Sequence, residues 1–370
     1  MSKNFNRIRR IGIPVLILLL ALIAALAIAL KQNRIVLTYT DLGVPNAELY
    51  GEEQINSRLA EDMTVFNGRL FVGSGDYDAN TGPVCVASCD PDTGIWDHSD
   101  PLPDEQIKRF RVLKGELVTL GTDPTEEWDL GNYYVFKEGV WETFRNLHGG
   151  VHCFDALEFE GKLFFALGVS AGNFPAVVFD DVAYSAVGFY KDGNLIDTTK
   201  FEIIRVYNLF TYKGELFAFL ALGSSESYLM DLYRFDGENF VYSHGSLPGE
   251  DMPDVISWGE RLFMVANSTL LVSDDLLSFN AINLGKGAHV ADITESDGKI
   301  SVLTWRELAL GYYEVAIFED GGDGFSKVLG IITRAPAGAF CKDGSDFYIS
   351  LGTRDLPSRD TGRVVKVTER

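Results

Sequence analysis

Apolar and polar residues alternate in short runs along most of the chain, and the runs occur in pairs separated by a tight turn. TVFNGRLFVGSG and LEFEGKLFFALG both show this unit of a strand, a glycine turn and a more apolar strand. Alternation with period two is typical of half-buried β-strands, and glycine supplies the positive φ that a short hairpin turn needs. The turn recurs at intervals of about 39 to 53 residues, which is typical of repeat folds. Its glycines are Gly68, Gly115, Gly161, Gly214, Gly259, Gly298 and Gly344.

Each unit continues with a second hairpin that ends in an aromatic residue, as in YYVFKEGVWETF and LYRFDGENFVYS. Two hairpins make a four-stranded blade, and blades repeated around an axis make a propeller. We therefore predict an all-β fold: a seven-bladed β-propeller of four-stranded blades over residues 35–370. The final segment GRVVKVTER leaves the last blade one strand short, so we expect RIVLTYTDLGV (residues 34–44) to complete it and close the ring.

Two acidic turns carry a family resemblance. VSDDLLSF (residues 272–279) and SCDPDTGIW (residues 88–96) resemble degenerate Asp-boxes of sialidase-type propellers. The region 35–370 thus looks like a propeller of the broad kelch and sialidase-like kind, although the Gly-Gly pair of kelch repeats is absent from its second strands. The resemblance implies the architecture and a turn-stabilising role for these residues, and it implies no activity.

The first 34 residues form a separate region. No charged residue interrupts the apolar run from Ile11 to Leu30, and Lys3, Arg7, Arg9 and Arg10 precede it. About 20 apolar residues suffice to cross a bilayer, and basic flanks stay in the cytoplasm. We expect a basic tail and a single transmembrane helix at 1–34, with an extracytoplasmic propeller at the cell membrane. The alternative is a cleaved signal peptide and a secreted propeller, since small residues at 25–29 offer cleavage sites.

The formal net charge is −21, and the region 1–34 contains no acidic residue, so the exported part is more acidic still. Such a surface repels phosphate backbones, which argues against nucleic-acid binding. Of the four cysteines, Cys85 and Cys89 lie too far apart along one strand to pair. The cysteines are either buried free thiols or include a Cys153–Cys341 bridge.

Two of the five histidines stand in one frame: VHCFDALEFEG and HVADITESDG both place Asp three residues after His and Gly six residues after Asp. The first strand of a propeller blade lines the central channel, so aligned positions in these strands form rings around it. The aligned rings give a candidate ligand-binding site at the channel mouth, made of His152, Asp155, Arg205, Asp254, His289 and Asp292. The alternative is that these side chains hydrogen-bond the loops that enter each blade.

DYDANTG spaces the oxygen-bearing residues Asp76, Asp78 and Asn80 as calcium loops do, and a solvated turn is the alternative. The chain has no GxSxG, HExxH or P-loop motif, and we assign no catalytic residue and no resident metal. We therefore expect a binding module for a protein partner or a glycan. The alternative is a glycan-acting enzyme that uses acidic channel residues, which requires two carboxylates ~5–10 Å apart.

Overall fold

The computed structural model describes residues 31, 34–36, 38–180, 184–224, 227–245 and 253–369. The apolar run at residues 11–30, and with it the predicted transmembrane helix, lies outside these residues. Within them, no helix is long and apolar enough to span a membrane. The helical turns in the described ranges are short 3₁₀ elements: η1 (Glu52–Arg58), η2 (Tyr77–Ala79), η3 (Thr198–Lys200) and η4 (Ala309–Gly311).

Nearly all other regular structure is antiparallel β-sheet, and four of the sheets have four strands each. Three of these are consecutive meanders: β2 (Asp62–Phe66), β3 (Arg69–Gly73), β4 (Ala87–Asp90) and β5 (Ile95–His98); β20 (Asp254–Trp258), β21 (Arg261–Ala266), β22 (Thr269–Ser273) and β23 (Asn280–Ile282); β24 (His289–Ser296), β25 (Lys299–Glu307), β26 (Tyr313–Asp320) and β27 (Phe325–Thr333). The fourth combines the two ends of the described chain: β28 (Ala337–Asp343), β29 (Asp346–Leu351), β30 (Val364–Thr368) and β1 (Thr40–Gly43).

A fourteen-stranded sheet contains three further meanders. These are β6 (Asp104–Leu113), β7 (Glu116–Pro124), β8 (Leu130–Lys137) and β9 (Val140–His148); β10 (Gly150–Phe159), β11 (Lys162–Val169), β12 (Ala176–Phe179) and β13 (Tyr184–Ala186); and β16 (Ile203–Tyr212), β17 (Glu215–Ser224), β18 (Ser227–Phe235) and β19 (Phe240–His244). Two single-residue pairings join them, His152 with Thr122 and Gly168 with Arg205. These pairings join the three meanders at the strand ends that lie away from the first hairpin turns.

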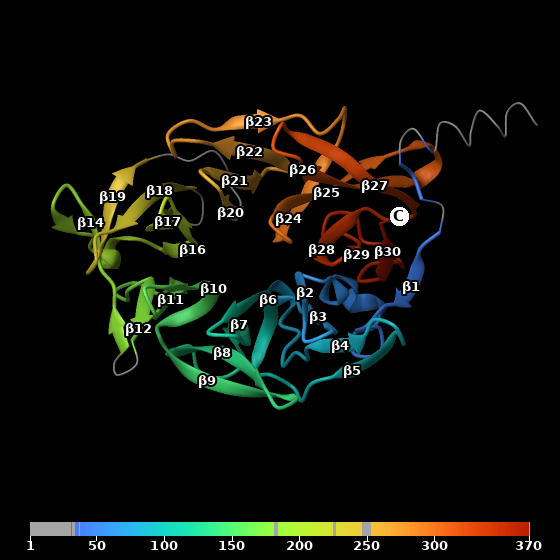
Figure 1. Cartoon of the computed structure of the whole chain (residues 1–370). Coiled ribbons are helices and arrows are strands. Elements are labelled where there is room, and N and C mark those ends of the chain that lie inside the picture. The colour runs from blue at the N-terminus through green and yellow to red at the C-terminus, as the bar shows by residue number, and fades with distance from the viewer. Residues whose placement is uncertain are drawn as a thin grey trace, which may run out of the picture.

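The meanders are arranged around a common centre in chain order, with the first strand of each innermost (Figure 1). Each inner strand contacts the next, and β28 contacts β2, so the ring is continuous. The middle strands are apolar on both faces because a neighbouring sheet covers each face. On β17, Phe217 and Phe219 pack into one buried cluster, while Ala218 and Leu220 pack into another.

The N-terminal strand closes the ring, as predicted. Thr40 of β1 pairs with Lys366 of β30 in an antiparallel ladder, and β1 lies beside β30 in Figure 1. This pairing covers the edge that β30 would otherwise present to solvent, which removes a site for aggregation. The prediction that the segment before the first unit completes the last sheet is confirmed.

The predicted hairpin turns are also confirmed. All seven turn glycines have positive φ, between 55° at Gly344 and 82° at Gly214. In five turns the residue before the glycine has positive φ as well: Asn67, Lys114, Glu160, Lys213 and Asp297. Two successive positive φ values define the hairpin turn whose twist matches that of the flanking strands.

The acidic turn at residues 272–279 has the stabilising role that the resemblance implies. Oδ1 of Asp275 accepts hydrogen bonds from the backbone N–H groups of Leu277 (2.8 Å) and Ser278 (2.9 Å). Ser273 Oγ accepts from the N–H of Leu276 at 2.8 Å. The hydrogen bonds from the N–H groups of Ser278 and Leu277 are the main cause that lowers the pKa of Asp275 to about 2. The side chains therefore fix the turn.

The third unit is long because it contributes strands to its neighbour. After β13 the chain forms a hairpin of β14 (Phe189–Lys191) and β15 (Asn194–Leu195), and β14 pairs in parallel with β19, the outer strand of the next meander. The four cysteines are free, so a Cys153–Cys341 bridge is not formed. Cys89, Cys153 and Cys341 are buried as apolar side chains would be.

Candidate functional site

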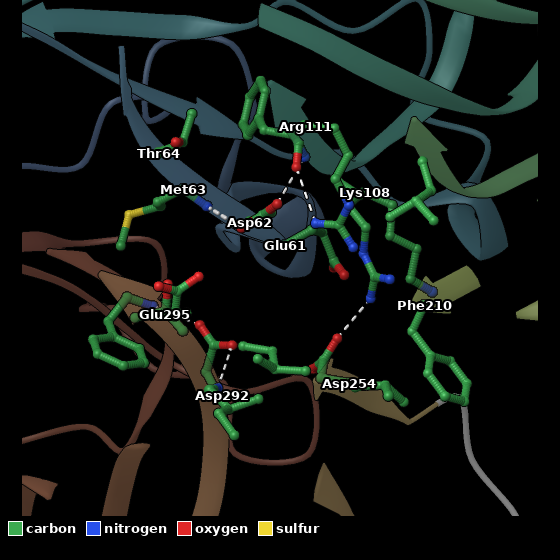
Figure 2. Close-up of a pocket in the computed structure, with 18 of the residues that line it drawn as sticks. Glu61, Asp62, Met63, Thr64, Lys108, Arg111, Phe210, Asp254, Asp292 and Glu295 are labelled. Atoms are coloured by element: carbon green, nitrogen blue, oxygen red, sulfur yellow. Dashed lines mark hydrogen bonds and ion pairs between the residues drawn. The ribbon is translucent and has the colours of Figure 1, made fainter. Parts of the chain in front are cut away.

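A cavity of about 540 Å³ occupies the centre of the ring, and the inner strands line it. Figure 2 shows Asp254 and Asp292 at this cavity, with Asp62 on another wall and Lys108 and Arg111 from β6 nearby. The cavity extends towards the hairpin turns of the inner strands, since it also contacts Thr64, Thr211 and Thr294. This first cavity is the channel predicted from the repeat.

Bulges in the inner strands determine which side chains face the channel. The strand register shifts immediately before the aligned position in β6, β10, β16 and β24, between the pairs Ile107/Arg109, Cys153/Asp155, Val206/Asn208 and Val290/Asp292. A bulge places an extra residue in one strand and re-aims its side chain. In β6, both Lys108 and Arg109 consequently line the first cavity.

Three aspartates of the inner strands, Asp62, Asp155 and Asp292, each link their own meander to the next one. One carboxylate oxygen of each accepts a hydrogen bond from a backbone N–H of the next inner strand: Asp62 from Phe110 (2.7 Å), Asp155 from Leu209 (3.0 Å) and Asp292 from Phe340 (2.9 Å). The other oxygen accepts from the residue that follows the aspartate: Met63 (2.7 Å), Ala156 (2.9 Å) and Ile293 (2.7 Å). The recurring aspartate therefore satisfies a backbone donor that the bulge removes from the ladder.

Two arginines, one of them buried, neutralise part of this acidic ring. Arg109, 7% exposed, places Nη2 2.6 Å from Asp254 Oδ1 and Nη1 3.6 Å from Asp155 Oδ2. Arg111 Nη2 lies 2.8 Å from Asp155 Oδ1. Asp155 and Asp254 are thus held on one guanidinium, which fixes the inner strands of different meanders relative to each other.

The carboxyl groups without an arginine resist ionisation. Burial raises the pKa of Asp62 to about 6, against the hydrogen bond from the Phe110 N–H. Burial also raises the pKa of Asp292 well above its ordinary value, and the charges of Asp254 and Asp62 add to the shift. Removing a carboxylate from water disfavours its charged form, and nearby like charges disfavour it further.

A second cavity, of about 340 Å³, opens at the ends of the inner strands away from their hairpin turns. Among the described residues it is lined by Tyr77, Lys108, Thr122, His152, Phe154, Arg205, Tyr207 and Tyr228. The two single-residue pairings between meanders place Thr122, His152 and Arg205 here. The wall is cationic and aromatic, in contrast to the acidic first cavity.

His152 is neutral in this second cavity. Its Nδ1 lies 3.1 Å from Oδ1 of Asp123. Burial, together with the charges of Arg205 and Lys108, lowers the pKa of His152 to about 3. Burial raises the pKa of Asp123 to about 6, although Arg205 acts in the opposite direction. The contact is therefore not an ion pair at neutral pH, and the imidazole is available to donate or accept a hydrogen bond.

The predicted site residues separate into three places. Asp254 and Asp292 line the first cavity, whereas Asp155 is buried beside Arg109, which joins it to Asp254. His152 and Arg205 lie at the second cavity. His289 enters neither of the two: its ring stacks on Trp305, with centroids 4.2 Å apart and planes at 9°. His152 and His289 occupy equivalent positions in two repeats, but one lines a cavity and the other stacks on a tryptophan.

In the loop whose spacing resembles a calcium loop, the acidic side chains contact a guanidinium. Arg354 Nη1 lies 2.8 Å from Asp76 Oδ1 and 3.4 Å from Asp78 Oδ2. Asn80 adopts a left-handed conformation and ends η2. Across the described ranges, no group of three His, Cys, Asp or Glu side chains is arranged to bind a metal ion.

Sequence reasoning missed residues that line both cavities. Six of them come from the position just before the aspartate, or before its counterpart, in an inner strand: Glu61, Lys108, Phe154, Tyr207, Ala291 and Gly338. No signal in the sequence marks these positions, because a bulge depends on pairing across the sheet. Tyr77 comes from a loop and carried no repeat signal.

Comparisons with known proteins bear on the fold. No protein family and no curated protein matches the sequence. A chain in the crystal structure of the Mitotic Checkpoint Complex is similar over 90% of this chain and 96% of its own length, with TM-score 0.54 and 11% identity. The β-propeller domain of Cps50 (Swd1) from Myceliophteria thermophila covers 81% of this chain and 92% of its own, with TM-score 0.50 and 10% identity. This chain is a β-propeller. At such low identity the likeness extends to the propeller fold alone.

Proposed function

We propose that this propeller is a binding module that holds a protein partner or a glycan at one mouth of its channel. The observation that carries the proposal is the second cavity, a hollow lined by cationic and aromatic side chains on a rigid ring. Ligand sites are concave, largely apolar and equipped with a few placed polar groups. We further propose that each meander is one blade, which makes seven blades with β1 completing the last.

We propose binding rather than catalysis because the channel carboxylates have other partners. Asp155 and Asp292 use both oxygens on backbone N–H groups, and Asp254 is held by Arg109. A glycan-acting enzyme needs one carboxyl free to give a proton and another to attack or activate water. The predicted carboxyl groups are engaged in joining neighbouring meanders, so none of them is free to act as the acid or the nucleophile of a glycosidase.

We propose that the propeller is extracytoplasmic and tethered to the cell membrane through residues 11–30, and that it is nearest in kind to kelch and sialidase-like propellers. The support is the charge-free apolar run with basic residues before it, and the two Asp-box-like turns. A C-terminal alkaline phosphatase fusion should be active only if the propeller is exported. Mass spectrometry of the intact protein should find residues 1–30 still attached; their loss would indicate secretion instead.

The binding proposal is tested with the full-length chain in mild detergent, on a glycan array and on immobilised envelope proteins. We compare Arg205→Gln with a matched substitution on the same meander, Arg234→Gln, whose guanidinium pairs with Glu215 on the outside. Binding that survives Arg234→Gln and is lost in Arg205→Gln supports the proposal. Absence of any binding, or equal binding by both variants, refutes it.

A further inference from the structure

The second cavity contains buried polar atoms without hydrogen-bond partners. Thr122 is 1% exposed, and its Oγ1 makes no hydrogen bond within the described structure. The same holds for Nδ1 of His152 and for Oδ1 of Asp123, which lie close together but are not aligned for a hydrogen bond. A buried polar atom left unpaired costs about 1–3 kcal/mol. Thr122 and His152 line the cavity and Asp123 lies directly beside His152, which indicates that the protein is built to receive polar groups there.

Two cationic side chains at the same cavity, Arg205 and Lys108, form no close ion pair with a carboxylate of the described residues. Arg205 contacts the hydroxyl of Tyr207 (3.4 Å) and the ring of Phe154 (5.9 Å to the centroid). Lys108 Nζ lies 5.9 Å from the centroid of Tyr77. Arg109 and Arg111, next along β6, are both paired with aspartates. Partly buried cations favour an opposite charge nearby, so an anion would complete this site.

Aromatic rings form a continuous wall beside these cations. Centroid distances run 6.0 Å from Tyr77 to His152, 5.3 Å from His152 to Phe154, 5.0 Å from Phe154 to Tyr207 and 6.4 Å from Tyr207 to Tyr228. All five rings line the cavity. Such a wall presents large, rigid apolar faces next to polar tips, which suits a ligand with an apolar ring face and polar substituents.

The charge balance restricts the anion. Lys108 and Arg205 supply at most two positive charges, since burial lowers the pKa of Lys108. Asp123 beside Arg205 and Glu61 beside Lys108 offset part of this charge, so the site favours a single negative charge over two. The protein as a whole carries −21, which repels an extended polyanion. A cavity of about 340 Å³ holds one or two sugar-sized rings.

We propose that the second cavity binds an acidic sugar residue of the uronic-acid type. Its carboxylate would pair with Lys108 and Arg205, its apolar ring face would lie on the aromatic wall, and its hydroxyls would bond to Thr122, His152 and Asp123. This inference rests on the proposed binding function and narrows it to a glycan with a monoanionic ring.

The test is isothermal titration calorimetry on the full-length chain in detergent with four probes: D-galacturonate, D-galactose, acetate and galactose 6-phosphate. We expect galacturonate to bind at least tenfold more tightly than each of the others, a difference of about 1.4 kcal/mol. Arg205→Gln should weaken galacturonate binding at least tenfold, while Arg234→Gln should leave it unchanged. Thr122→Val, which removes a hydroxyl at constant volume, should weaken it several-fold and serves if Arg205→Gln fails to fold.

Equal binding of galactose or acetate overturns the inference, as does tighter binding of the sugar phosphate or unchanged affinity in Arg205→Gln and Thr122→Val. These results are distinguishable from failure of the binding function itself. If galacturonate does not bind but binding on the glycan or protein array still depends on Arg205, the proposed binding function is supported and only the proposed ligand class is wrong. If both signals are absent, the proposed function is wrong.

Discussion

Asp155 links three blades, and its removal provides the sharpest test of the channel as a structural ring. The side chain is 2% exposed and contacts four groups: the N–H of Ala156 and of Leu209, and the guanidinium groups of Arg109 and Arg111. Asp155→Ala removes all four contacts at once. It leaves the Leu209 N–H without an acceptor and Arg109 with Asp254 as its remaining carboxylate partner.

The expected loss follows from the buried contacts. A buried donor without a partner costs about 1–3 kcal/mol, and breaking a buried ion pair from one side costs about 3–5 kcal/mol. Because these penalties share the same groups, we do not add them, and we expect Asp155→Ala to lower the free energy of unfolding by about 3–5 kcal/mol. At roughly 2 °C per kcal/mol for a chain of this size, the melting temperature should fall by about 6–10 °C. Asp155→Asn keeps an acceptor oxygen and should lose about half as much.

The assay is a thermal melt of the full-length chain followed by circular dichroism. The matched control is Asp97→Ala, which breaks an exposed pair with Arg69 whose atoms lie 2.8 Å apart. An exposed pair contributes little, so this variant should melt within about 1 °C of the wild type. If Asp155→Ala melts as high as Asp97→Ala, the aspartate ring does not hold the blades together and our interpretation of the channel is wrong.

Three further predictions follow from other contacts. Burial raises the pKa of Asp104 to about 7, against hydrogen bonds from Tyr134 and Asn132, while the pKa in the unfolded chain is about 4. Between these two pH values the folded state binds more protons than the unfolded state, so stability falls as the pH rises from about 4 to 7. Asp104→Asn should flatten this part of a plot of melting temperature against pH, and an unchanged slope would contradict the prediction. A chain that begins at residue 45 lacks β1 and should self-associate through the open edge of β30, whereas one that begins at residue 34 should stay as dispersed as the full chain in sedimentation; equal behaviour would show that β1 is dispensable. EDTA should leave the melting temperature unchanged because Arg354 already neutralises Asp76 and Asp78, and a fall of several degrees would reveal a cation.

The repeat was predictable because its signals are local. Glycine at each hairpin turn and alternation along each strand depend on neighbours in the sequence, and the structure has those hairpins at Gly68 and Gly298 as expected. Closure by the N-terminal strand was predictable because a missing strand at one end matched an extra strand at the other. The destination of the β14–β15 hairpin was not predictable, because its partner β19 is chosen by packing between blades.

The site was harder to predict because bulges depend on pairing across the sheet. Of the predicted residues, Asp254 and Asp292 line the first cavity and Asp155 is buried beside Arg109, but nothing in the sequence marks which residue a bulge turns inward. Lys108 was missed for that reason. His289 shares its frame with His152 and yet stacks on Trp305, because an adjacent strand offers it an indole face where His152 meets Phe154 and Asp123.

The pairing of β1 with β30 has a consequence for biogenesis. The contact joins Thr40 to Lys366, so the first strand to emerge from the ribosome has to remain unpaired until the last one arrives. Pairings between such distant parts of a chain form slowly, and an unpaired strand is prone to misassociation meanwhile. The ring can therefore close only after β30 has been synthesised, and β1 stays without its sheet partner in the nascent chain until then.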